Sequence, residues 1–254
     1  MLKKRLIGVV TVKDGWAVQS FGYCRYLPLG KPEVLVQNLD RWGADEILVQ
    51  CIDRSAAGLG PDLDVLSKIS KLGIATPLIY AGGICRREDA VKVVSGGADR
   101  IMLDAMLLDS PQSLEAVARD LGTQAVIAHL PARMVGDDLM ALDHRDRSER
   151  SLEHWLANLP FEWISELMVT DWDHEGLPCS FDERLLMVAE RIDKPLLCFG
   201  GISEAAQIQR VMAHPKVVAV GVGNFLSYRE HAVQSLKQQL ATSAVRTPHY
   251  ESSV

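Results

Sequence analysis

The chain has 254 residues, a hydrophobic fraction of 48%, a charged fraction of 24% and a formal net charge of −6. This length suits one (β/α)8 barrel of about 250 residues, and the acidic balance argues against a protein that binds nucleic acid through a basic face. No apolar run approaches the ~18–20 residues that a membrane-spanning helix needs, so we expect no membrane contact. The start MLKKRLIGVV lacks a signal-peptide cleavage pattern, and the five cysteines are scattered, so we expect a reducing, cytoplasmic location.

Short apolar runs alternate with amphipathic stretches along the whole chain. The runs are continuous rather than alternating in polarity, which is typical of parallel strands covered on both faces. Strands are predicted at 6–11, 46–51, 77–80, 101–103, 125–129, 167–170, 195–199 and 217–222. Amphipathic stretches, such as 32–42, 62–73 and 110–122, predict the intervening helices, whereas the polar stretch 143–151 predicts a surface loop. The pattern indicates an α/β protein of the TIM-barrel type.

An internal repeat supports this fold class. The segment YAGGICRREDAVKVV resembles CFGGISEAAQIQRVM, and their Gly-Gly-Ile triplets begin at Gly82 and Gly200, 118 residues apart. Asp53 and Asp173 correspond at a spacing of 120 residues in a second pair of similar segments. Two features that repeat in the same order predict two (βα)4 half-barrels, at about 1–122 and 123–240, within one domain. Residues 241–254 are expected to form a flexible tail.

The repeated glycines suggest anion binding. Gly82–Gly83 and Gly200–Gly201 each end a strand and precede a helix, where glycine permits close backbone approach and helix N–H groups favour an anion. Gly223 and Asn224 leave the eighth strand, where TIM barrels often bind phosphate. At the equivalent place in the first half stands Asp104, which would repel phosphate unless it is protonated or turned away. The alternative is that these glycines only form tight turns.

Several segments, in order, resemble the cyclase subunit of imidazole glycerol phosphate synthase over residues 1 to about 240. They are KRLI…VKDG, GADEILVQCID, AGGICRREDA, GGADRIMLDA, TDWDHEG…FD and GGIS…GVGNF. The resemblance implies a TIM barrel without metal or cofactor that takes ammonia from a glutaminase partner and acts on a phosphorylated sugar. It implies phosphate or substrate contacts at nine positions: Gly82, Gly83, Asp104, Thr170, Gly176, Gly200, Gly201, Gly223 and Asn224.

The family's two acid/base aspartates, at the ends of strands one and five, correspond here to Thr11 and Leu130. Neither side chain can exchange a proton near pH 7, and losing such a group costs ~10²–10⁴-fold in rate. Asp173 and Glu175, after strand six, are then the candidate acid/base residues. The alternative is that each carboxylate caps the next helix or accepts loop N–H groups. With Leu130 placed inward, His129 is expected to point outward.

Other family positions at this end also differ. The aspartate that usually ends strand two is Cys51, the basic residue after strand one is Gln19, and the Asn-Thr pair of the first phosphate loop is Asp104–Ala105. We expect Cys51 to be a small buried hydrophobe rather than a nucleophile. Trp16 and Trp172 are expected at the mouth, either stacking on a sugar or packing.

Charges at the opposite end of the barrel match the family. The resemblance places an ammonia gate of two cations and two anions at Arg5, Glu46, Arg100 and Glu166, with Asp99 as a contact to the glutaminase. The alternative is that these are solvated charges at strand starts. All four have the expected sign, which favours the gate.

Three functions remain open, and whether the chain is itself an enzyme is open with them. The first is an ammonia-using lyase or synthase subunit acting on a phosphorylated or nucleotide-linked sugar. Its segment 18–33 resembles a branch found with surface-polysaccharide biosynthesis, where ammonia is used for amidine formation on an N-acetylated amino sugar. The second is ordinary imidazole glycerol phosphate synthase with replacement acids, and the third is a non-catalytic barrel that activates a glutaminase and channels ammonia. The related phosphoribosyl-formimino isomerase uses aspartates at the same two strand ends, so their loss counts against it equally.

Overall fold

The computed structural model describes residues 3–157, 159–228, 230–240 and 245–247. Eight parallel strands form a closed barrel in which the last pairing, between β7 and β10, completes the ring. The barrel strands are β1 (Arg5–Lys13), β4 (Glu46–Cys51), β5 (Leu78–Ala81), β6 (Arg100–Leu103), β7 (Val126–Val135), β10 (Glu166–Asp171), β11 (Leu196–Phe199) and β12 (Val217–Val222). The predicted TIM barrel and its eight strands are confirmed.

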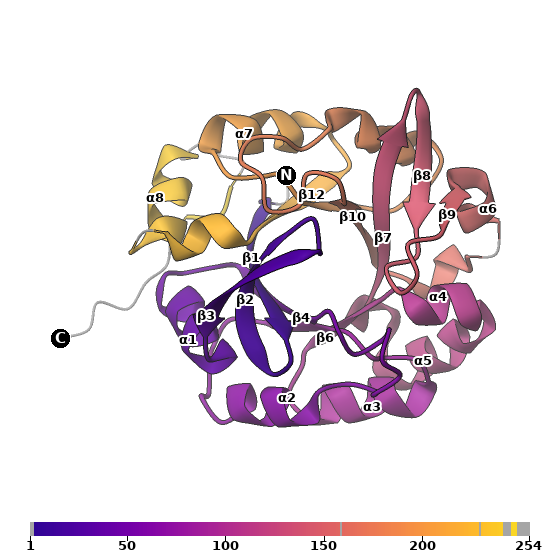
Figure 1. Ribbon diagram of the computed structural model, residues 1–254, viewed down its shortest axis with the longest axis horizontal. Coiled ribbons are helices and arrows are strands. Elements are labelled where there is room, and N and C mark those ends of the chain that lie inside the picture. Colours follow the sequence, from indigo (N-terminus) through magenta and orange to yellow (C-terminus); the bar gives the residue numbers. More distant parts are fainter. Residues whose placement is uncertain (1–2, 158, 229, 241–244, 248–254) are drawn as a thin grey trace.

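Helices surround the barrel (Figure 1). The α-helices are α1 (Pro32–Arg41), α2 (Leu63–Ser70), α3 (Arg87–Ser95), α4 (Ala105–Asp109), α5 (Leu114–Leu121), α6 (Leu152–Leu156), α7 (Ala205–Ala213) and α8 (Ala232–Gln239). The 3-10 segments are η1 (Pro111–Ser113), η2 (Thr123–Ala125), η3 (Phe161–Trp163), η4 (Glu183–Glu190) and η5 (Asn224–Ser227). No helix among the described residues is long and apolar enough to cross a bilayer. Of the tail predicted to be flexible, only 245–247 are described, and Val245 bridges to Lys4.

Two β-hairpin extensions follow the first and fifth barrel strands. β2 (Trp16–Phe21) and β3 (Arg25–Gly30) extend β1, while β8 (Asp138–Leu142) and β9 (Glu149–Ser151) extend β7. The surface loop predicted over 143–151 is confirmed for 143–148, which connect β8 to β9, although Asp143 is buried. It is wrong for 149–151, which form β9 and pair with β8.

The barrel has an inner and an outer apolar core. The inner core fills the lumen with side chains that include Ile7, Val9, Leu48 and Met168, and the outer core lies between the strands and the helices. Because side chains alternate along a strand, each barrel residue belongs to one core or the other.

The repeated glycines are explained by close packing within this chain. A Cβ on Gly82 would lie 2.1 Å from the carbonyl oxygen of Cys51, at the end of the preceding barrel strand. A Cβ on Gly200 would lie 2.3 Å from the carbonyl oxygen of Asp171, again at the end of the preceding strand. Both glycines also have positive φ, +112° and +94°. Gly82 and Gly200 thus make equivalent contacts, which is consistent with two half-barrels. These contacts support the interpretation that the glycines form tight turns.

Candidate functional site

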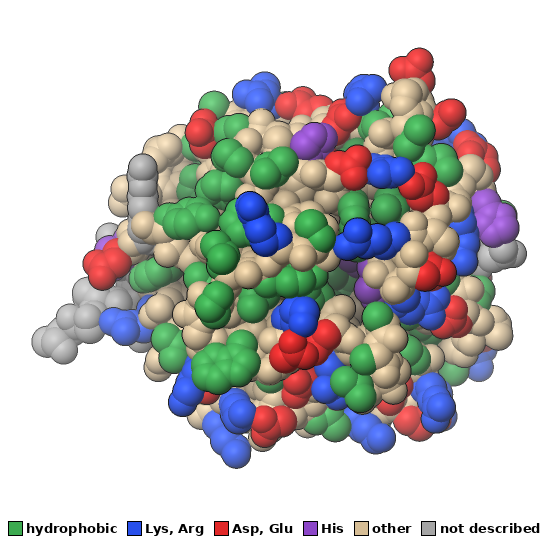
Figure 2. Space-filling model, in the orientation of Figure 1, with side chains coloured by type: hydrophobic (Ala, Val, Ile, Leu, Met, Phe, Trp, Pro, Cys, Tyr) green, Lys and Arg blue, Asp and Glu red, His purple; other side chains and the backbone are tan. Residues whose placement is uncertain are grey.

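A cavity of about 120 Å³ opens at the carboxyl ends of the strands, where TIM barrels carry their active sites. It is smaller than the ~300 Å³ at the lower end of small-molecule pockets. Figure 2 views this face, and histidine surface shows in a hollow near its centre. The lining comes from the β2–β3 hairpin, the ends of β4 to β7 and the β8–β9 connection: Tyr23, Tyr26, Gln50, Cys51, Ile52, Ser55, Ala81, Gly82, Met102, Asp104, His129, His144, Arg147 and Trp172.

Asp104 is the charged centre of this cavity. Its Oδ1 accepts the N–H of Ala105 at the start of α4, 2.5 Å away. Its Oδ2 lies 3.2 Å from Nδ1 of His144 and 3.6 Å from Nδ1 of His129. Burial opposes ionisation, but the two imidazoles and the Ala105 N–H hold the pKa of Asp104 well below its usual range. Asp104 is thus an anion paired with histidines, which disfavours phosphate there.

Two polar pairs face the lumen at this end of the barrel. Gln50 Nε2 donates to Thr11 Oγ1 at 2.8 Å, and His129 Nε2 is hydrogen-bonded to Thr170 Oγ1 at 2.9 Å. Thr11 follows Ile7 and Val9 on the lumen side of β1, so its predicted inward position is correct. These contacts place Thr170 beside a histidine.

The predicted orientation of the fifth strand is wrong. Leu130 is buried in the outer core, and His129 points inward and lines the cavity. In the register between β7 and β10, the residue opposite Thr170 is Pro131 and not Leu130. In the register between β1 and β4, Thr11 lies opposite Gln50 in the same way. Because side chains alternate along β7, an error of one residue exchanges its inward and outward faces. The predicted site therefore lacked His129.

The two predicted acids lie outside the cavity lining. Asp173 has a side chain 43% exposed and lies 3.7 Å from Nη1 of Arg133. Glu175 is 2% exposed, and its Oε2 accepts Ser20 Oγ at 2.9 Å and the Tyr23 N–H at 3.3 Å. Glu175 therefore fastens the β2–β3 hairpin over the mouth. Burial raises the pKa of Glu175, partly offset by these hydrogen bonds.

Aromatic side chains complete the closed hairpin. The rings of Tyr23 and Trp172 lie 4.6 Å apart, so Trp172 packs on the hairpin and also lines the cavity. Trp16, at the start of β2, is 55% exposed and is not among the lining residues. Cys51 is buried, which raises the pKa of its thiol to about 12 and leaves it a neutral lining group.

The predicted phosphate contacts are largely occupied by this chain. Gly83 N–H donates to Ser55 Oγ at 2.9 Å, and a Cβ on Gly201 would lie 2.6 Å from the amide nitrogen of Phe181. Asn224 donates to the Ser20 carbonyl at 2.6 Å and accepts the Ser20 N–H at 3.2 Å.

Two further glycines lie beside Asn224 and differ in the space around them. A Cβ on Gly176 would lie 2.1 Å from the carbonyl oxygen of Ser20. The atoms nearest to a Cβ on Gly223 would be two of the Phe199 ring, at 3.4 and 3.5 Å, and Val9 Cβ at 3.8 Å. Of the predicted glycines, Gly223 is therefore the least crowded.

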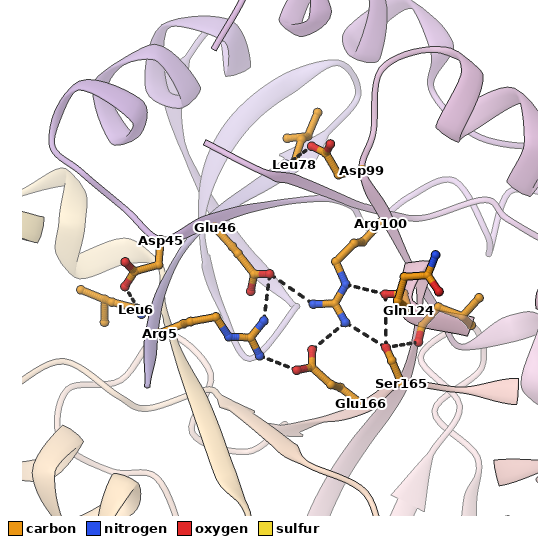
Figure 3. Close-up of polar contacts among 11 residues, drawn as sticks. Arg5, Leu6, Asp45, Glu46, Leu78, Asp99, Arg100, Gln124, Ser165 and Glu166 are labelled. Atoms are coloured by element: carbon orange, nitrogen blue, oxygen red, sulfur yellow. Dashed lines mark hydrogen bonds and ion pairs between the residues drawn. The ribbon is translucent and has the colours of Figure 1, made fainter. Parts of the chain in front are cut away.

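The predicted charges at the opposite end form a closed ring (Figure 3). Arg5 lies 2.9 Å from Glu46 and 2.5 Å from Glu166. Arg100 lies 3.2 Å from Glu46 and 2.6 Å from Glu166. Burial raises the pKa of Glu46, against the lowering effect of the two arginines. Asp99 stands beside the ring and accepts the Leu78 N–H at 2.8 Å.

Sequence reasoning missed His144, Tyr23 and Gln50 as site residues. His144 lies in the polar stretch 143–151, and its proximity to Asp104 depends on the β8–β9 extension. Among the described residues, no group of three or more His, Cys, Asp or Glu side chains has the arrangement of a metal site. Polar side chains, one carboxylate and two imidazoles thus make up the candidate site.

Comparison with known proteins gives the family. A putative imidazole glycerol phosphate synthase subunit, hisF2, of Vibrio vulnificus (strain YJ016) is 27% identical over 243 residues, covering 94% of this chain and 89% of that protein. The imidazole glycerol phosphate synthase subunit HisF of Bacillus pumilus (strain SAFR-032) is 25% identical over 251 residues, 97% of this chain and 99% of that protein. The family model described as "Histidine biosynthesis protein" matches residues 5–232. The chain is thus similar to HisF cyclase subunits over nearly its whole length, and it belongs to the histidine biosynthesis protein family.

Proposed function

We propose that this barrel receives ammonia from a glutaminase bound at the amino-terminal ends of its strands. The ammonia is used at the opposite mouth on a phosphorylated or nucleotide-linked sugar. The observation that carries the proposal is the ring of Arg5, Glu46, Arg100 and Glu166, joined by four ion pairs at the entrance to an apolar lumen.

The ring and lumen suit the passage of a small neutral molecule. All four charged residues begin barrel strands, and beyond them the lumen is lined by Ile7, Leu48 and Met168 among others. An apolar passage excludes ammonium, because an unpaired charge is costly to bury, and admits neutral ammonia. Ala81 and Met102 belong both to the lumen and to the cavity lining, so the two spaces adjoin.

The mouth favours a substrate that differs from one with a phosphate at each end. Asp104 is ionised where the first phosphate would bind, whereas Gly223, on the other side, has only ordinary van der Waals neighbours. One phosphate near Gly223 is consistent with both observations. Amidine formation on an N-acetylated amino sugar for surface polysaccharide is our specific version of this function, supported by the likeness of segment 18–33 to that branch.

The second candidate is ordinary imidazole glycerol phosphate synthase. It is supported by the names of the HisF relatives and by residues at the mouth that can exchange protons, His129 and His144. A non-catalytic ammonia channel is the third reading, and the polar cavity with its ionised Asp104 counts against it.

The test is to mix the full chain with class I glutaminase subunits and measure glutamine hydrolysis, with and without the histidine-pathway intermediate. We expect binding and stimulation without imidazole product. Glu166→Gln should weaken the stimulation, because it removes one charge of the ring, whereas Glu204→Gln, at the exposed start of α7, should not. Absence of binding and stimulation with every glutaminase would overturn the proposal. Imidazole product at a normal rate would establish the second candidate instead.

A further inference from the structure

We propose that Asp104 and His144 form the proton-transfer pair of this barrel, with Nε2 of His144 as the atom that exchanges the proton. The inference rests on the proposed function, because ammonia must lose a proton when it becomes a substituent. It assigns that role to Asp104, the N-cap residue between β6 and α4, and to His144 in the β8–β9 connection, rather than to the positions of Thr11 on β1 and Leu130 on β7.

The charge of the Asp104 carboxylate biases the tautomer of the His144 imidazole. Oδ2 of Asp104 lies 3.2 Å from Nδ1 of His144. An anion at this distance favours the tautomer that carries its hydrogen on Nδ1, which leaves the lone pair on Nε2. Asp104 itself is held by the Ala105 N–H, so it is a positioning residue with a fixed orientation.

The two histidines beside Asp104 differ in their free atoms. His129 uses Nε2 for its hydrogen bond to Thr170, so that nitrogen is occupied. Nε2 of His144 has no hydrogen-bond partner within the described part of the chain, and His144 lines the cavity. His144 is therefore the imidazole that can meet a substrate.

The surroundings can accept both ammonia and a carbonyl oxygen. Ammonia leaving the lumen beside Met102 enters the same cavity. The Tyr23 hydroxyl is buried, lines the cavity and has no hydrogen-bond partner among the described residues, so it can donate to an oxygen there. The charged and titratable groups around the cavity with His144 are Asp104, His129, Arg147, Tyr23, Tyr26 and Cys51.

The reaction class that fits is the addition of ammonia to a carbonyl carbon of a sugar. The nitrogen lone pair forms the C–N bond while the π electrons of the C=O bond move to oxygen. The nitrogen then gives one proton to Nε2 of His144, and the imidazolium gives that proton to the oxygen. The sum is NH3 added across C=O to give a carbinolamine, with His144 returned to its starting state and no co-reactant.

The first test is independent of any substrate. In the full chain labelled with 15N-histidine, we expect neutral His144 to show the Nδ1–H tautomer in the wild type and to lose that preference in Asp104→Asn, which removes the anion beside Nδ1. A merely structural role for Asp104 would leave the tautomer ratio unchanged. An Nε2–H tautomer in the wild type, or a tautomer ratio unchanged by Asp104→Asn, would overturn the pairing.

The second test uses ammonium chloride and D-ribulose 5-phosphate as probes, with cyanoborohydride trapping of the derived imine and mass detection of the amine. We expect the wild type to accelerate trapping and His144→Gln to lose at least ~100-fold of that acceleration. His174→Gln should match the wild type, since His174 is also paired with an aspartate, Asp171 at 2.8 Å, but does not line the cavity.

The two tests separate this inference from the proposed function. Ammonium chloride bypasses the glutaminase, so failure of every glutaminase to bind would leave the trapping result and the tautomer intact. No acceleration by the wild type would overturn the carbonyl assignment. Equal acceleration by the wild type and His144→Gln would overturn the role of His144, even where glutaminase stimulation is observed.

Discussion

Replacing Glu175 by alanine is expected to release the β2–β3 hairpin from the mouth of the barrel. Glu175 is buried, and its Oε2 accepts Ser20 Oγ at 2.9 Å and the Tyr23 N–H at 3.3 Å. Its backbone carbonyl accepts the Gly22 N–H at 2.9 Å, and this bond survives the substitution. The variant therefore removes the side-chain part of the fastening and keeps the backbone part.

The expected size follows from the bonds lost. A hydrogen bond to a charged group contributes about 1.5–3 kcal/mol, and the cost of burying the carboxylate offsets part of two such bonds. A net loss of about 2 kcal/mol corresponds to an open hairpin about 30 times more populated. Glu175→Gln keeps an acceptor and removes the charge, so closure should be retained.

Closure should also depend on pH with a defined sign. Burial raises the pKa of Glu175 above the ordinary value of 4.5 for a glutamate. The neutral carboxyl is therefore favoured in the closed state, so closure is strongest below pH 4.5, weakens as the pH rises through the raised pKa, and is level above it. Glu175→Gln should lose this dependence.

Limited trypsin digestion measures the open population, because Arg25 at the start of β3 is exposed and cleavage there requires local opening. Fluorescence of Trp172, whose ring packs against that of Tyr23 at 4.6 Å, provides a second signal. We expect cleavage after Arg25 about 30-fold faster in Glu175→Ala and near the wild-type rate in Glu175→Gln. Cleavage of the alanine variant at the wild-type rate, or equal cleavage of both variants, would refute this reasoning.

Three further predictions concern stability and reactivity. Gly82→Ala should lower the free energy of unfolding, measured with a chemical denaturant, by about 3–5 kcal/mol, because the new Cβ would lie 2.1 Å from the Cys51 carbonyl oxygen. Gly15→Ala is the control: it has open space but φ +76°, so it should lower that free energy by only about 1 kcal/mol. Asp45→Ala should lower the free energy of unfolding by about 3–5 kcal/mol in the same assay, because it leaves the buried Lys237 ammonium without the carboxylate that lies 2.7 Å away. Cys51 should resist iodoacetamide at pH 8 in the native protein, since burial raises its thiol pKa to about 12; mass spectrometry should find the label on exposed cysteines, Cys24 and Cys179.

The sequence predicts the barrel well because its signals are local. Continuous apolar runs and helix caps lie within single elements, and all eight barrel strands fall where the runs are. The β2–β3 and β8–β9 hairpins lie in mixed segments without a clear period, so they were not predicted. Their pairing depends on neighbouring strands rather than on their own sequence.

The candidate site is harder to predict for a related reason. A parallel strand buried on both faces has no polar–apolar alternation, so the sequence does not show which residues face the lumen. In β7 the sequence therefore did not show whether Leu130 or His129 faces the lumen. The match to the family placed Leu130 inward, whereas His129 is the residue that lines the cavity. His144 lies on a different element from Asp104, and no spacing in the sequence signals their contact.

Both ends of the lumen hold buried charges that stability alone does not explain. Replacing a buried ion pair by apolar groups of similar volume is often neutral or stabilising. Yet Glu46 stays in the ring although burial raises its pKa, and Asp104 stays at the mouth beside two imidazoles. Between these charged ends the lumen is apolar. An apolar lumen with a charge ring at one end and a cluster of one carboxylate and two imidazoles at the other is the arrangement that the proposed transfer of ammonia would use.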